Sequence, residues 1–221
     1  STKEVVEDLT DDPKLQSIFA AQWGYYGSPP SRSSFAIQAL VVKHFLYGGY
    51  YPIGGSQEIA NQLLRTVAQG GGWTRINASV DEILIRKGKA IGVRLDSGEE
   101  VLANRVISAA GAVATTQRLL PEKYRQHQWA SRIARLAPAS AHICLYLGFK
   151  GDIRKAGATG ANKWFYNTWD NEFDDWSVAP DKPLEDSPCL YCSFPSLKDP
   201  THEPGPKELH TGEVVTFVPW K

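Results

Sequence analysis

The stretch ASVDEILIRKGKAIGVRLDSGEEVLANRVISAAG, residues 78–111, decides the fold, because its apolar and polar residues alternate with the period of two typical of half-buried strands. Gly-bearing turns at Lys87-Gly88 and Ser97-Gly98 separate three such runs. This spacing predicts an antiparallel meander of short strands, the last of which continues through VISAAG (106–111).

Helices are expected on the amino-terminal side of this stretch. Asp12-Pro13 favours a helix start, because the Asp side chain accepts an orphan amide and Pro has no amide to satisfy. We expect helices over LQSIFAAQW up to Gly24, from a cap at Ser33 or Ser34 to Gly48-Gly49, and from Ser56 to Gly70–Gly72. In the third helix, Ile59, Leu63, Leu64 and Val67 form an apolar stripe that predicts a buried face.

Further helices and strands are expected after residue 111. The pattern predicts helices at Ala112–Leu119, ending near Pro121, and at Tyr124–Leu136, closed by Ala137-Pro138. Apolar runs predict strands at AHICLYLGF (141–149), CLYCSF (189–194) and VVTFVPW (214–220). The fold class is therefore α+β, with a mixed sheet that includes the antiparallel meander and with packed helices.

Composition argues against nucleic acid as a partner. The 221 residues are 42% hydrophobic, and 24 basic residues balance 24 acidic ones. A chain with no net charge has no field to attract phosphates, so nucleic acid is not an expected partner. The sequence starts at Ser1 and contains no Met, which suggests a fragment.

Membrane-spanning, signal-peptide and disulfide patterns are missing from the sequence, and this bears on the expected cellular location. No stretch approaches the roughly 20 apolar residues of a membrane-spanning helix, and no signal peptide opens the chain. The three cysteines are too few for a disulfide framework. We expect a cytoplasmic protein, or one in peripheral contact with a membrane.

Common catalytic patterns are missing from the sequence. His44, His127, His142, His202 and His210 have no zinc-ligand spacing, so no metal is expected. The CxxC of Cys189 and Cys192 lies in a strand-like run without a second pair, and no serine-hydrolase elbow is present. No side chain stands out as a catalytic acid, base or nucleophile.

Two glycine-containing segments remain as candidate ligand contacts. No GxGxxG motif or P-loop is present. Gly54-Gly55-Ser56, however, precedes a helix, where free amides can face a ligand. In VISAAG an apolar strand runs into Ala and Gly, whose small side chains leave the backbone open to a ligand. Each segment has an ordinary structural explanation as well. The first can be a tight turn with a helix cap, and the second a strand packed beneath a helix.

The segments YYPIGGSQEIANQLL (50–64) and 78–111, in this order, resemble the middle of phytoene desaturase-type flavoproteins. The flanking stretches YGSPPSRSSFAIQALVVKHFLYGGYYPIGGS (26–56) and FPSLKDPTHEPG (194–205) resemble the retinol saturase branch in particular. The resemblance covers nearly the whole chain. It implies an enzyme that depends on flavin adenine dinucleotide (FAD) and saturates, desaturates or isomerises double bonds of a polyene, carotenoid or retinoid-like lipid.

The resemblance also implies a domain organisation and site residues. Residues 1–221 would be the internal, substrate-side part of a two-domain enzyme, with the meander region 73–111 contributing to the FAD side. The amino-terminal Rossmann segment and the carboxy-terminal FAD segment would lie outside it, leaving the piece alone inactive and without tight FAD binding. The matching positions are Val80, expected near the adenine; Ala109, Ala110 and Gly111, beside the cofactor; and Gly54, Gly55 and Ser56, near flavin and substrate.

Many aromatic residues are consistent with an apolar pocket. They are Trp73, Trp129, Trp164, Phe165, Tyr166, Trp169 and Trp176. Such rings either line a ligand pocket or simply pack in a core. The sequence therefore leaves a second hypothesis open, a non-catalytic lipid-binding or interaction module derived from the same fold.

Overall fold

The computed structural model describes residues 1–136, 141–172 and 186–218. The chain divides into two compact units. The sheet unit comprises Ser1–Leu63 and Ala139–Lys221, and the meander unit comprises Leu64–Pro138.

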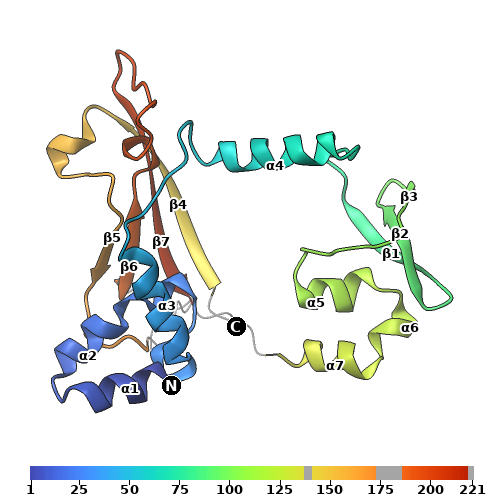
Figure 1. The fold of residues 1–221 in the computed structure, drawn as a ribbon, viewed down its shortest axis with the longest axis horizontal. Helices are drawn as coiled ribbons and strands as arrows, with labels where there is room; N and C mark the ends of the chain where they lie inside the picture. The colour runs from blue at the N-terminus through green and yellow to red at the C-terminus, as the bar shows by residue number, and fades with distance from the viewer. Residues whose placement is uncertain (137–140, 173–185, 219–221) are drawn as a thin grey trace. The chain divides into compact units, whose positions relative to one another are not determined.

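The meander unit contains the antiparallel sheet that the sequence predicts. Its strands are β1 (Val80–Arg86), β2 (Lys89–Leu95) and β3 (Glu100–Leu102), hydrogen-bonded in the order β1-β2-β3 (Figure 1). Lys87 (φ 49°) and Gly88 (φ 76°) both have the positive φ of a two-residue hairpin turn. The predicted meander is confirmed, because this turn reverses the chain and pairs β1 antiparallel with β2, with register shifts between Val80 and Glu82 and between Leu84 and Ile85.

The predicted strand at VISAAG is wrong. Strand β3 ends at Leu102, and residues 105–110 pair with no strand among the described residues. Ile107 lies in this run with 95% of its surface exposed. Alternation alone does not make a strand, because an extended segment needs a neighbour to satisfy its backbone groups.

Short helices follow in the meander unit. They are α5 (Ala112–Ala114), the π-type turn η3 (Thr115–Leu119), α6 (Glu122–Arg125) and α7 (Gln128–Ala134). The helix expected over Tyr124–Leu136 is thus broken, because His127 takes an extended backbone (φ −59°, ψ 143°). Strand β1 contacts η3, with Ile83, Leu95 and Leu120 buried in this unit. The predicted closing residues Ala137-Pro138 lie outside the described residues.

The sheet unit is built on a four-stranded sheet. Its strands are β4 (Ala141–Lys150), β5 (Lys163–Tyr166), β6 (Cys189–Ser193) and β7 (Leu209–Val218), in the order β4-β7-β6-β5 (Figure 1). Every strand pairing in both sheets of the described chain is antiparallel. The expected mixed sheet is therefore wrong, and the fold class is α+β with two antiparallel sheets. An apolar run shows that a strand is buried, but the direction of its neighbour depends on the path of the chain.

Helices accompany this sheet. They are α1 (Thr2–Leu9), α2 (Pro13–Ala20), α3 (Phe35–Phe45) and the 3₁₀ turns η1 (Ala21–Tyr25), η2 (Pro30–Arg32), η4 (Ile153–Ala156) and η5 (Pro195–Leu197). The predicted cap is confirmed, since Asp12 Oδ1 accepts from the Lys14 N–H at 2.8 Å. Ser34 occupies the cap position of α3. The helical path continues past the predicted stop at Gly24 to Tyr25.

The core of the sheet unit joins the turn η1 to the sheet. Trp23, Cys189 and Phe217 are buried together, and the Trp23 and Phe217 ring centroids are 4.7 Å apart. The Tyr166 hydroxyl donates to the Ala21 carbonyl. A Cβ on Gly24 would lie 2.5 Å from Cη2 of Trp164, so a side chain there would displace the indole. Glycine therefore lets η1 pack directly on an aromatic side chain from β5.

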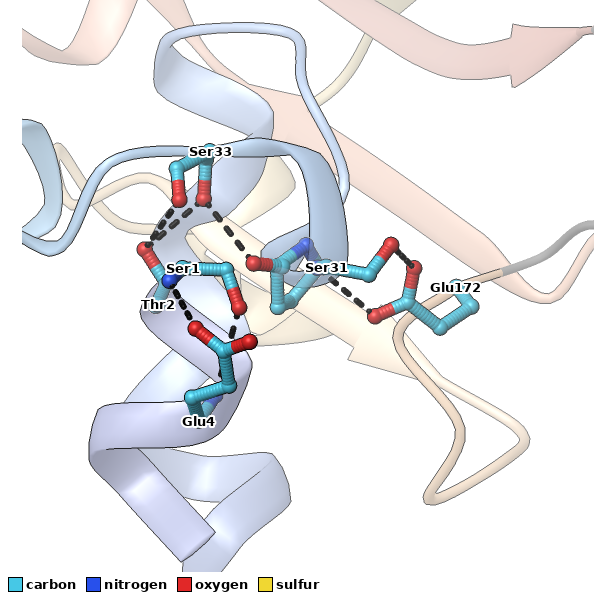
Figure 2. Close-up of polar contacts among 7 residues, drawn as sticks. Ser1, Thr2, Glu4, Ser31, Ser33 and Glu172 are labelled. Atoms are coloured by element: carbon cyan, nitrogen blue, oxygen red, sulfur yellow. Dashed lines mark hydrogen bonds and ion pairs between the residues drawn. The ribbon is translucent and has the colours of Figure 1, made fainter.

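Polar contacts join the amino terminus to Ser33 and join Ser31 to Glu172 (Figure 2). The Thr2 N–H donates to the Ser33 carbonyl at 2.9 Å, and the Ser33 hydroxyl donates to Thr2 Oγ1 at 2.8 Å. Ser31 donates its N–H and its hydroxyl to the two carboxylate oxygens of Glu172, at 3.0 and 2.6 Å. The serine-rich stretch after η1 thereby connects α1 with the chain that follows β5.

Helix α4 (Gln57–Gln69) forms where the sequence predicts it, but its apolar stripe is not buried. Ile59 is 57% exposed and Leu63 is 63% exposed. The division between the two units falls within this helix, so neither unit buries it. The predicted buried face is wrong. Amphipathic periodicity identifies the apolar face of a helix, but it does not show that a neighbouring element covers that face.

None of the described helices combines the length and the apolar character that a membrane span requires.

Candidate functional site

A cavity of about 730 Å³ lies in the sheet unit. Its walls come from η1, the end of α3, the loop that follows α3, the start of β5 and the end of η5. The residues that line it include Gln22, Tyr25, Phe45, Tyr51, Asn162, Trp164 and Lys198. The volume is in the range typical of pockets for small organic ligands.

One wall of the cavity is aromatic. The ring of Tyr25 lies 5.1 Å from that of Phe45 and 5.3 Å, edge-on, from that of Trp164. The Trp164 indole N–H donates to the Tyr25 hydroxyl at 3.3 Å, which holds the two rings in this arrangement. Since Trp164 also packs over Gly24, the wall is fixed to the core of the unit.

Lys198 adds a positive charge to the lining of the cavity. Its ammonium donates to Asn162 Oδ1 at 2.5 Å and to Ser193 Oγ at 2.6 Å, and lies 5.7 Å from the centroid of the Tyr51 ring. Burial lowers the pKa of Lys198 from its ordinary value, although the negative charge of Glu213 acts in the other direction. The cavity therefore combines aromatic surface with one partly desolvated cation.

The side-chain amide of Gln22 is a further polar group of the cavity wall, and its oxygen lacks a hydrogen bond within the described chain. This oxygen, Oε1, is buried. A buried polar atom of this kind is ordinarily satisfied by water or by a ligand.

The glycine turn begins three residues after the cavity residue Tyr51. Gly54 and Gly55 have φ values of 88° and 89°, a backbone that side-chain-bearing residues rarely adopt. The Gly54 N–H donates to Asp199 Oδ1 at 3.2 Å, although 145 residues separate them. Asp199 also accepts from the Thr201 N–H at 2.9 Å and its hydroxyl at 2.7 Å, and these bonds lower the pKa of the Asp199 carboxyl.

Two segments that resemble the retinol saturase branch thus meet here. Tyr51 and Gly54 come from the stretch 26–56, and Lys198 and Asp199 come from 194–205. Lys198 contributes to the cavity, while Asp199 holds the turn. The loop after β6 therefore contributes to both parts of the candidate site.

The candidate residues named from the sequence fall into both units. Gly54, Gly55 and Ser56 lie in the sheet unit, whereas Val80 and Ala109–Gly111 lie in the meander unit. Val80 begins β1 opposite Leu95. The other three are exposed just before α5, and Gly111 has φ 89° with no atom within 4 Å of a Cβ position.

Bare backbone at Ala109–Gly111 is compatible with a flat ring or a diphosphate. Two methyl side chains and a glycine leave the backbone open, so a planar group can approach it closely. These residues therefore fit a flavin nucleotide on the grounds of space.

Histidine and cysteine chemistry is not supported by the geometry. Ser196 Oγ lies 3.2 Å from His210 Nδ1, but both residues are buried. Burial raises the pKa of the Cys189 thiol to about 11, which opposes the thiolate form. In the described residues, no group of three His, Cys, Asp or Glu side chains could hold a metal.

The aromatic residues named from the sequence have different environments. Trp164 lines the cavity and Tyr166 packs against the core. The exposed members are Trp73, Trp129, Phe165 and Trp169, while Trp176 lies outside the described residues. The sequence reasoning missed Tyr25, Phe45, Lys198 and Asp199. Only the FPSLKDPTHEPG motif signalled the last two.

Comparisons with known proteins agree on one family. A family model described as flavin containing amine oxidoreductase matches residues 1–218. The all-trans-retinol 13,14-reductase of Rattus norvegicus is 32% identical over 213 residues, which are 92% of this chain and 35% of the relative. The neurosporene-forming phytoene desaturase of Rhodobacter capsulatus is 32% identical over 175 residues, 78% of this chain and 33% of that protein.

Two further matches qualify this picture. A Danio rerio protein named inactive all-trans-retinol 13,14-reductase is 32% identical over 209 residues, 91% of this chain and 34% of its own. The solved structure of an oxidoreductase from Methanosarcina mazei shares the fold, with a TM-score of 0.65 and 19% identity over 99% of this chain and 47% of that one. The chain therefore spans about a third of the length of its curated relatives. The resemblance to retinol saturases and phytoene desaturases is confirmed.

Proposed function

The chain belongs to the family of flavin-containing amine oxidoreductases, and we propose that it forms the substrate-side region of an enzyme that saturates, desaturates or isomerises carbon–carbon double bonds of a polyene lipid. The observation that carries this proposal is the aromatic cavity of about 730 Å³ beside the glycine turn. The ring faces of its aromatic wall suit the elongated, apolar molecules that carotenoids and retinoids are. The names of the relatives, a retinol reductase and a phytoene desaturase, support the same substrate class.

The proposed cofactor is FAD, with its main binding segments outside the 221 residues. A bound flavin supplies the hydride-transfer chemistry that amino-acid side chains lack. We assign secondary cofactor contacts to Ala109–Gly111, on the support of their exposed positions and the open space at Gly111, and to Val80, at the start of β1, on the support of the family resemblance. The run 105–110, which pairs with no strand among the described residues, has backbone groups with which a further segment of the same protein could pair.

The chain's own residues would bind and orient the substrate. Tyr25, Phe45 and Trp164 offer ring faces to an extended π-system. Gly54 and Gly55, with no side chains, let the substrate or flavin approach the backbone, and Ser56 follows in the same turn. The proton that accompanies hydride transfer in saturation or desaturation is not assigned to any described residue.

A second candidate function is a non-catalytic lipid-binding module of the same fold. Its support is the similarity to a relative whose name describes it as inactive. The aromatic cavity serves this function equally well, since binding an apolar ligand requires no flavin. The two candidates therefore differ in cofactor content.

The deciding experiment is to purify the protein from its complete gene, in parallel with residues 1–221, after adding FAD. We expect the longer protein to show flavin absorbance, with FAD identified by mass spectrometry after release, and the shorter chain to show little. A complete protein that stays colourless after reconstitution would reject the enzyme proposal in favour of the lipid-binding module.

A pair of glycine variants tests the cofactor contacts. Gly111 and Gly157 have φ values of 89° and 87°, and neither has an atom within 4 Å of a Cβ position. Gly111→Val should reduce the FAD retained per protein, because a branched side chain would cover the bare backbone. Gly157→Val introduces the same backbone strain away from the proposed contact and should retain FAD. Equal retention in both variants would remove Gly111 from the cofactor site.

A further inference from the structure

The charge of Lys198 lacks an anionic partner in the part of the chain that the structure describes. Its ammonium uses two of its three N–H donors on neutral oxygens, those of Asn162 and Ser193. No described carboxylate lies within ion-pair distance of it. Glu213 acts on Lys198 only through its longer-range field. A half-buried cation without a counter-ion is stabilised when a bound ligand places an anionic group beside it.

The surroundings of Lys198 select the kind of anion. The cavity that it lines also has the ring faces of Tyr25, Phe45 and Trp164. Inorganic anions gain nothing from such a wall, whereas a carboxylate at the end of an elongated apolar molecule can use the cation and the rings together. Asn162, which lines the same cavity, adds amide N–H donors beside the ammonium.

The position of Lys198 is defined by its supports. Ser193, which accepts one of its hydrogen bonds, is almost fully buried at the end of β6. The Tyr51 ring lies 5.7 Å from the ammonium, and the next residue in sequence, Asp199, is bonded to Gly54. The ammonium is therefore held near one place instead of moving freely in solvent, which reduces the entropy that binding would cost.

We propose that the cavity of the sheet unit binds the carboxylate end of an elongated apolar acid, with the Lys198 ammonium as its anchor. The apolar body of the acid lies along Tyr25, Phe45 and Trp164. This inference rests on the assignment of the cavity to the substrate, and it names the polar group that the site accepts.

The test uses cis-parinaric acid, a conjugated polyene acid that fluoresces in apolar sites, and its neutral methyl ester. Titrations of the complete protein without turnover should show that the acid binds at least about tenfold more tightly than the ester, the contribution expected of a hydrogen bond to a charged group. Lys198→Gln should weaken binding of the acid by about tenfold and change binding of the ester by less than about twofold. Lys198→Arg should retain most of the preference for the acid.

Lys155→Gln is the matched control, because Lys155 is an exposed lysine of η4 outside the cavity lining. It should leave both affinities unchanged. Equal binding of acid and ester by the unaltered protein, or equal weakening of both by Lys198→Gln, would overturn the proposal. Because the titration needs neither flavin nor turnover, a failure here leaves the flavin measurement free to support or reject the proposed function.

Discussion

The two sheets of this protein are built from contacts of different sequence range. In the meander unit each strand pairs with its neighbour in sequence, and a two-residue turn at Lys87-Gly88 joins β1 to β2. In the sheet unit β4 pairs with β7, so that Ala141 lies opposite Val218. Local pairing can be recognised from periodicity and turn residues, whereas distant pairing depends on how the whole unit packs.

The cores of the two units differ in the same way. Aliphatic residues such as Ile83 and Leu95, from adjacent strands, are buried in the meander unit. In the sheet unit Trp23 packs on Phe217, almost at the other end of the described chain. The candidate cavity belongs to this second kind of structure, since its walls come from segments before residue 52 and after residue 159.

The largest expected effect comes from removing the aromatic core of the sheet unit. Trp23 is 1% exposed, so Trp23→Ala should lower the free energy of unfolding by about 3–5 kcal/mol, through lost burial and the cavity left behind. Urea unfolding followed by circular dichroism measures the change. Trp169→Ala, at a tryptophan that is 56% exposed, should cost less than about 1 kcal/mol. Equal losses in the two variants would contradict the assignment of the core.

A smaller effect is expected from a clash inside the meander. A Cβ on Gly92 would lie 2.3 Å from the Val101 carbonyl oxygen of the neighbouring strand, and Gly92 has φ 152°. Gly92→Ala should therefore cost about 1–3 kcal/mol. Hydrogen exchange followed by mass spectrometry should show faster exchange in residues 80–102 and unchanged exchange in 141–150.

Gly148→Ala is the control for this variant, because the position on β4 has no atom within 4 Å of a Cβ. It should leave exchange in both sheets close to that of the unaltered protein. Faster exchange throughout the chain after Gly92→Ala would show that the two units unfold together and would weaken the contrast between them.

The smallest effect is local and depends on pH. Hydrogen bonds from Thr201 lower the pKa of Asp199, so the folded state favours its carboxylate. The contribution of this carboxylate is fully present above its ordinary pKa of about 3.9 and is lost as the pH falls through the lowered value. The Gly54 amide proton, which donates to Asp199, should report this titration in NMR spectra by changing its chemical shift below the ordinary pKa.

Two variants separate the Asp199 contact from general effects. Asp199→Ala should abolish the titration at Gly54 and speed exchange of its amide, whereas Asp12→Ala should act instead on the Lys14 amide that it caps. A Gly54 shift that titrates at or above the ordinary carboxyl pKa would show that Asp199 does not hold the turn.

Several parts of the fold could be predicted because their causes lie within a few residues. The cap at Asp12, the turn at Lys87-Gly88 and the alternation of β1 and β2 are set by local dihedral preferences and side-chain direction. The errors occurred where a partner was needed. The stripe on α4, the run 105–110 and the expected mixed sheet all assumed neighbours that periodicity does not identify.

By itself, the sequence determined the meander, most of the helices and the membership of a flavin oxidoreductase family. Only the tertiary structure selected Tyr25 and Phe45 as companions of Trp164, placed Lys198 in their cavity, and bonded Asp199 to Gly54. The reason is physical. Turns and caps are decided by neighbouring residues. A contact between residues 145 positions apart forms only when folding of the intervening chain brings them together.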